Sequence, residues 1–145
     1  MHGRVVDHKS EDFVTWTGQR LAPAGDAVHD LGLRLVFYDH MTVVEVPTFA
    51  DSTPYAVCSG GGDALQSLVV LRVTGGWNRE VSARVSGARS CIHLMELRGP
   101  LATTAFQSVG FIRRQQPARL DANGWPVKID SCCAYSAHSE QVMRH

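Results

Sequence analysis

Residues 28–46, Val-His-Asp-Leu-Gly-Leu-Arg-Leu-Val-Phe-Tyr-Asp-His-Met-Thr-Val-Val-Glu-Val, contain the clearest secondary-structure pattern in the chain. Apolar residues alternate with polar or small ones, which is the period of a β-strand with one buried face. That face begins at His29 and continues with Leu31, Leu33, Leu35 and Phe37. A turn at Asp39-His40 and a return strand over residues 42–46 complete a predicted β-hairpin.

The segments on either side of this hairpin are less regular. Residues 4–7 and 13–17 are short β-prone runs separated by polar residues, and they predict a small hairpin or two edge strands. Residues 47–62 contain two prolines and the run Ser59-Gly-Gly-Gly62, which predicts a loop that carries Cys58. Asp63 is the expected N-cap of a short helix over residues 64–69.

The second half of the chain has helical periodicity. Trp77, Val81 and Val85 are spaced by four, and polar residues lie between them, so an amphipathic helix is predicted over residues 77–86. A second apolar stripe predicts a helix over residues 92–109, which Pro100 should kink or split in two. Residues 126–135 alternate again and predict a last strand.

Together these elements predict an α+β fold in which an antiparallel sheet is covered on one face by the two helices. Both periodicities turn one set of side chains inward. The predicted core is Leu31, Leu33, Leu35, Val81, Val85, Leu94, Leu97, Leu101 and Phe106.

Composition limits the classes of protein and of partner. The chain has 145 residues, 44% of them hydrophobic, which predicts a single domain over residues 1–145. Fourteen basic and fourteen acidic residues cancel, so a small-molecule substrate is expected rather than nucleic acid or a membrane. Neither a membrane span nor the apolar core of a signal peptide is evident, so a cytoplasmic protein is expected. A homo-oligomer, or a subunit of a larger complex, stays open.

Ser90-Cys91-Ile92-His93 opens the second predicted helix and suggests a site. Thiolate and imidazole are ligands that zinc and iron accept readily, and a helix N-terminus lowers the pKa of a thiol. The pair is also consistent with a buried cysteine and a histidine that binds backbone groups. The cysteines are few for a disulfide framework, which favours reduced thiols; they are Cys58, Cys91, Cys132 and Cys133.

From about Gly3 to Tyr135 the order of motifs resembles a bacterial family known as domain of unknown function 2889. The residues that carry the resemblance are Gly3-Arg-Val-Val-Asp7, Val28-His29-Asp30, Pro54-x-x-x-Cys58, Gly76-Trp77, Gly87-x-x-x-Cys91-x-His93-Leu94-x-Glu96-Leu97, Ala102-Thr-Thr-Ala-Phe-Gln107 and Asp130-x-Cys132-x-Ala134. The chain differs from the family's usual pattern at Ser90 and Cys133, where glycine and histidine are common. The resemblance implies no activity.

A more distant architectural likeness is to iron–sulfur scaffold proteins of the NifU and SufU type. In those proteins a ligand at the start of a β-hairpin, a cysteine in the next loop and ligands at a helix N-terminus meet. The likeness implies that His29 and Asp30 at the strand start, Cys58 in the loop, and Cys91 with His93 at the helix converge.

Three functions are compatible with these residues. The first is a metal-dependent lyase, isomerase or hydrolase that acts on a small organic molecule. It would hold one Zn²⁺ or Fe²⁺ per chain and use Asp30 or Glu96 as the acid–base group. The expected metal ligands are His29, Cys58, Cys91 and His93; Asp30 could replace His29, because adjacent strand residues point to opposite faces.

The second function is a non-enzymatic metal or cluster carrier, or an accessory subunit of a larger enzyme complex, with a closed four-ligand site. The third is a metal-free enzyme in which Cys91 is the nucleophile and His93 its base. The third leaves Cys58 and His29 unexplained.

Overall fold

The computed structural model describes residues 1–18, 20–38 and 40–144. Its internal contacts divide the chain into two compact units, Met1–Ser108 and Val109–His145, and each is described by itself. The expectation of one domain over residues 1–145 remains a prediction.

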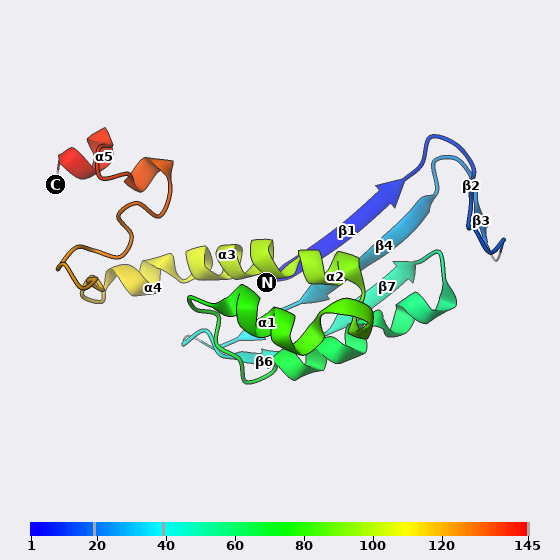
Figure 1. The fold of residues 1–145 in the computed structure, drawn as a ribbon, viewed down its shortest axis with the longest axis horizontal. Coiled ribbons are helices and arrows are strands. Elements are labelled where there is room, and N and C mark those ends of the chain that lie inside the picture. The colour runs from blue at the N-terminus through cyan, green and yellow to red at the C-terminus, as the bar shows by residue number, and fades with distance from the viewer. Residues whose placement is uncertain (19, 39, 145) are drawn as a thin grey trace. The chain divides into compact units, whose positions relative to one another are not determined.

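The first unit is built on a three-stranded antiparallel sheet in the order β1-β4-β7 (Figure 1). These strands are β1 (His2–His8), β4 (Ala27–Arg34) and β7 (Thr48–Ser52). After β4 the chain continues into β5 (Val36–Phe37), which pairs with β6 (Val43–Glu45). The predicted hairpin is therefore confirmed in this part, although Asp39 of its turn lies outside the described residues.

Of the two alternatives for the first two β-prone runs, the small hairpin is wrong, whereas the edge position is confirmed for β1, which is an outer strand of the β1-β4-β7 sheet. β1 pairs with β4, and β2 (Phe13–Val14) pairs instead with β3 (Leu21–Ala22). The physical reason is burial: the β1–β4 register sets Val5 beside Leu31, on the face that also carries Leu33.

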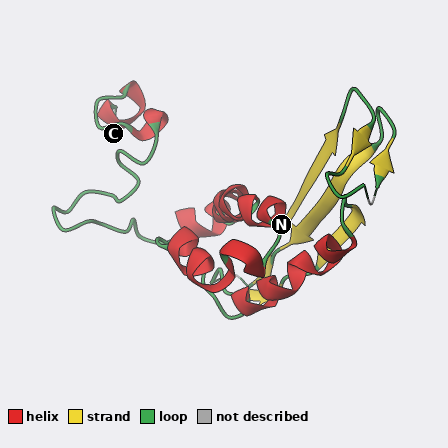
Figure 2. Cartoon of the chain, turned by 45° about the vertical axis from the view of Figure 1, so that its right-hand side comes forward, coloured by secondary structure: helices red, strands yellow, loops and turns green. Residues whose placement is uncertain are grey.

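Helices of the first unit gather on one side of the sheet (Figure 2). They are the 3-10 helices η1 (Ala56–Leu68) and η2 (Gly87–Arg89) and the α-helices α1 (Trp77–Val85), α2 (Ile92–Glu96) and α3 (Arg98–Ser108). α1 confirms the helix that was predicted over residues 77–86 and ends one residue earlier than predicted, at Val85. The expected helix over residues 64–69 forms the end of the longer η1, which stops at Leu68, so Asp63 lies inside a helix rather than at its N-cap. The loop predicted over residues 47–62 is wrong, because β7 and the first half of η1 occupy most of it.

The predicted long helix is split between α2 and α3 at Leu97. Pro100 lies in the first turn of α3, where a backbone N–H has no partner within the helix in any case. None of the described helices combines the length and the apolar composition that crossing a membrane requires.

Most of the predicted core is buried. Leu97 is only partly buried, and Phe106 is 48% exposed, so its placement in the core was wrong. On α3 the buried stripe consists of Leu101 and Ala105. Phe106 follows Ala105 directly, so the turn of the helix places its side chain outside this stripe. The confirmed members are Leu31, Leu33, Leu35, Val81, Val85, Leu94 and Leu101.

The second unit contains α4 (Gly110–Arg114), η3 (Cys133–Tyr135) and α5 (Glu140–Met143). The predicted strand over residues 126–135 is wrong, because the described backbone there forms turns, and an isolated bridge joins Leu120 to Pro126. Asp130 has φ of 59°, which interrupts an extended chain. Val127 is 50% exposed, so the alternation of this segment does not mark a buried face.

Candidate functional site

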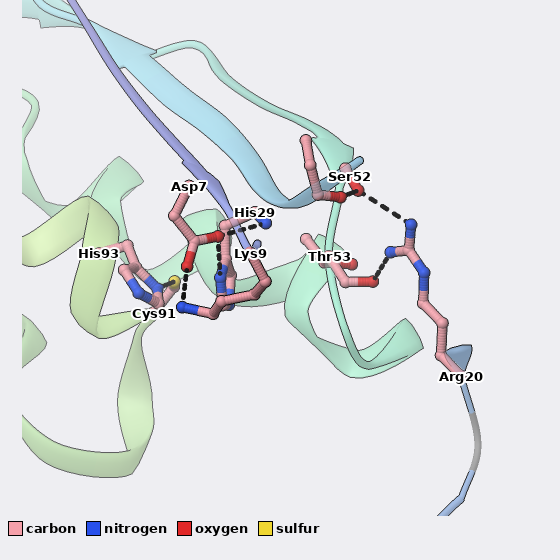
Figure 3. A network of polar contacts seen from close by, with 9 residues as sticks. Asp7, Lys9, Arg20, His29, Ser52, Thr53, Cys91 and His93 are labelled. Atoms are coloured by element: carbon pink, nitrogen blue, oxygen red, sulfur yellow. Dashed lines mark hydrogen bonds and ion pairs between the residues drawn. The ribbon is translucent and has the colours of Figure 1, made fainter. Parts of the chain in front are cut away.

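Four side chains with metal-ligand or acid–base chemistry gather where β1 ends and where β4 and α2 begin (Figure 3). They are Asp7, His29, Cys91 and His93. The antiparallel register pairs Asp7 with His29, and both lie on the sheet face that carries Leu31. α2 packs against β4 and brings Cys91 and His93 to the same place.

Asp7 holds His29. Its Oδ1 accepts a hydrogen bond from the His29 backbone N–H at 2.8 Å and lies 3.0 Å from the His29 Nδ1, while Lys9 Nζ donates to Oδ2 at 3.1 Å. Burial raises the pKa of Asp7, but hydrogen bonds from Lys9 and His29 outweigh it and lower that pKa to about 2. The ionised carboxylate therefore favours a proton on Nδ1 of His29, which leaves Nε2 free to bind a proton or a metal.

His93 faces both Cys91 and His29. The Cys91 Sγ lies 3.8 Å from the His93 Nδ1, and the centres of the two imidazole rings are 4.1 Å apart. Burial lowers the pKa of His93, and His29 lowers it further, against a weaker opposite effect of Asp7. These effects favour the neutral form of His93, whose ring has one nitrogen that can accept a hydrogen bond or bind a metal.

Gly61 of η1 fixes the position of Cys91. The Cys91 backbone N–H donates to the Gly61 carbonyl at 3.1 Å, and the Ser90 hydroxyl donates to the same carbonyl at 2.8 Å. A β-carbon on Gly61 would lie 2.7 Å from the Cys91 β-carbon, so only glycine permits this close approach.

Cys58 lies on the same helix as Gly61. It precedes Gly61 by three residues, and residues three apart share one face of a 3-10 helix. Cys58 is half-buried, and its backbone N–H donates to the Tyr55 carbonyl at 3.0 Å. The described contacts join Gly61, rather than Cys58, to Cys91.

The two expected acid–base residues have other partners. Asp30 follows His29 on β4 and points to the opposite face, where Arg4 donates to its carboxylate at 2.6 and 2.5 Å and lowers its pKa. The Glu96 side chain is 71% exposed and lies 3.5 Å from an Arg98 nitrogen. Their assignment as acid–base groups stays a prediction.

One distance within the cluster is compatible with binding of an ion, but the cluster is not a formed metal site. Among the described residues, no three His, Cys, Asp or Glu side chains are already arranged to hold an ion. Zinc bound at about 2.3 Å to sulfur and about 2.0 Å to nitrogen separates the two ligand atoms by about 3.6 Å in a tetrahedral array. The 3.8 Å between Cys91 Sγ and His93 Nδ1 is close to that value.

The distance between the two histidine rings does not fit a tetrahedral metal site. Two imidazoles on one tetrahedral ion have ring centres about 5 Å apart, whereas those of His29 and His93 are 4.1 Å apart. A bound ion would therefore require the His29 ring to move away by about 1 Å.

Sequence reasoning found three members of the cluster but missed Asp7 and the contact made by Gly61. Asp7 continues the inward-facing alternation of Gly3 and Val5. That alternation was a signal for Asp7, but its pairing with His29 follows from the strand register.

A family model described as "Protein of unknown function (DUF2889)" matches residues 1–107, a range that contains the whole cluster. No curated protein and no solved structure matches the chain.

Proposed function

Since the chain belongs to the DUF2889 family of proteins of unknown function, whose description names no activity, we propose a function from the site alone. The protein is a metal-dependent enzyme that holds one Zn²⁺ or Fe²⁺ per chain and acts on a small organic molecule. Lyase, isomerase and hydrolase chemistry are all within the reach of such a site.

The observation that carries this proposal is the Cys91–His93 pair, whose sulfur and nitrogen lie 3.8 Å apart beside a histidine already held by a carboxylate. Metal-binding histidines usually donate their second ring N–H to a carboxylate or a carbonyl. Asp7 supplies that carboxylate for His29. Three protein ligands with one open position is the usual composition of a catalytic zinc site.

Each residue then has a distinct role. Cys91 and His93 would hold the ion through Sγ and Nδ1, and His29 would hold it through Nε2 while Asp7 orients the His29 ring. The ion would polarise a substrate carbonyl or lower the pKa of a bound water at the open position. Cys58, on the η1 face that leads to Gly61, is the candidate for a fourth ligand.

The test is metal content per chain in protein purified anaerobically without added metal. We expect about one ion per chain in the native protein and a loss of most of it in Cys91→Ser and in His93→Ala. Cys132→Ser is the matched control, because Cys132 is an exposed cysteine of the second unit. Native protein that contains no metal and takes none up from excess Zn²⁺ or Fe²⁺ would contradict the proposal.

The same experiment separates the enzyme from the carrier. If Cys58→Ser keeps its metal, the site has an open position, as an enzyme needs. If Cys58→Ser loses it as fully as Cys91→Ser does, the site is closed by four ligands, which favours the carrier suggested by the NifU and SufU likeness.

The contact between Cys91 and His93 also favours a second candidate, a metal-free enzyme with Cys91 as nucleophile. Thiol labelling of metal-free protein tests it. A Cys91 that reacts much faster with iodoacetamide than Cys132, with an advantage that His93→Ala removes, would support it. Equal rates at the two cysteines would contradict it.

A further inference from the structure

The sheet face opposite the cluster contains a hollow of about 330 Å³. Its lining residues come from the start of β1 and the end of β4, where the register pairs His2 with Arg34, and from the start of β7 with the residue before it. They are His2, Arg34, Pro47, Thr48 and Phe49. A volume of this size is at the lower end of the range for small-molecule sites.

One wall of the hollow is apolar and held in place. The Phe49 ring lies against the backbone of β4 at Gly32, because a β-carbon there would be 2.6 Å from the ring. The His2 ring lies at 5.4 Å from the Phe49 ring, and Pro47 continues the same wall. A ligand with an aromatic ring would meet a preformed apolar surface here.

The lining also carries a positive charge, the guanidinium of Arg34. On this face Arg4 is neutralised by Asp30 through two hydrogen bonds. Arg34 is exposed and, within the described part of the chain, has no carboxylate in ion-pair distance. A guanidinium can bind both oxygens of a carboxylate at once, which a single ammonium group cannot do with the same geometry.

We propose that this hollow binds a small aromatic carboxylate, with the ring against Phe49 and Pro47 and the carboxylate on Arg34. The apolar wall would contact the ring, the Arg34 guanidinium would bind the carboxylate, and the small volume limits the size of the ligand. The site lies on the other sheet face from Cys91 and His93, so it does not depend on the proposed metal chemistry.

Calorimetric titration of the full chain with benzoate tests the proposal. We expect one site per chain, and Arg34→Gln should weaken binding by about tenfold or more, because it removes a charge-assisted hydrogen bond. Phe49→Leu should weaken binding too. Arg79→Gln, which removes an exposed cation on α1, is the matched control and should bind benzoate like the native protein.

Two further ligands test which features are recognised. Cyclohexanecarboxylate, which keeps the charge but lacks the planar ring, should bind more weakly than benzoate, and so should inorganic phosphate. Absence of benzoate binding, equal binding of phosphate, or unchanged binding in Arg34→Gln overturns the proposal. Arg34 is exposed, so its replacement leaves the buried core intact and the result does not depend on a folding defect.

Discussion

The carboxylate of Asp7 orients the His29 ring and determines which of its two nitrogens carries the proton. Replacing Asp7 by asparagine keeps the shape but removes the charge that favours a proton on Nδ1 of His29. We expect Asp7→Asn to weaken metal binding by about 10–100-fold, as is usual for a group that orients a ligand. Competition with a chelator measures this change, and Asp51→Asn, an exposed aspartate on β7, is the control. Equal affinity in Asp7→Asn and native protein would contradict the role of Asp7.

The same carboxylate makes stability depend on pH. The pKa of Asp7 is lowered from 3.8 to about 2 in the folded protein. Ionised Asp7 therefore stabilises the fold fully above about pH 4, and this contribution is lost as the pH falls through about 2. The Asp7 side chain is 34% exposed, so its contribution is discounted to about 1 kcal/mol.

Urea unfolding of metal-free protein at pH 6, 4 and 3 measures this dependence. Native protein should lose more stability between these values than Asp7→Asn, whose side chain does not titrate. Parallel curves for the two proteins would show that Asp7 has an ordinary pKa.

The contact between η1 and α2 depends on a glycine. In Gly61→Ala the new β-carbon would lie 2.7 Å from that of Cys91, so the two elements must separate. We expect a loss of about 1–3 kcal/mol in the free energy of unfolding, together with weaker metal binding. Gly60→Ala is the matched control, because its β-carbon would meet nothing closer than an Asp63 oxygen at 3.7 Å. Equal stability of the two variants would count against the docking of α2 on η1.

β4 is the strand on which the core is built. Leu33 is 2% exposed, and Leu33→Ala should lower the free energy of unfolding by about 2–5 kcal/mol because it leaves a cavity between the sheet and the helices. Val57→Ala on η1 is the control, since Val57 is 82% exposed and should cost less than about 0.5 kcal/mol. Chemical denaturation compares the two, and a small loss in both would place Leu33 outside the core.

The spacing of apolar residues predicts a strand or helix well where the buried face is set by residues close together in the sequence. The inward face of β4 and the stripe of α1 are examples, because each is set by the geometry of one element. Pairing depends on distant segments, so the partnership of β1 with β4 was missed and a strand was expected over residues 126–135.

The candidate site shows the same limit. His29, Cys91 and His93 could be selected by residue type, and the structure brings them together. Asp7 could not be selected in this way, because its importance comes from the strand register that sets it opposite His29.

At the scale of the whole molecule, the buried apolar side chains among the described residues lie between Ala22 and Ala105, within the first unit. The family match ends at residue 107, close to the same boundary. A fragment of residues 1–108 should therefore fold, with a free energy of unfolding within about 0.5 kcal/mol of the full chain. Circular dichroism and urea unfolding test this, and an unfolded fragment would instead support the single domain that composition predicted.

The position of the cluster in the chain has a consequence for the order of folding. Asp7 and His29 lie on paired strands near the N-terminus, whereas Cys91 and His93 follow after η1, α1 and η2. The entropic cost of bringing two segments together rises slowly with the length of chain between them, and contacts between distant residues form slowly. On a growing polypeptide the two histidines can meet only after α2 has been synthesised, and an ion bound by both rings would then tie the paired N-terminal strands to α2.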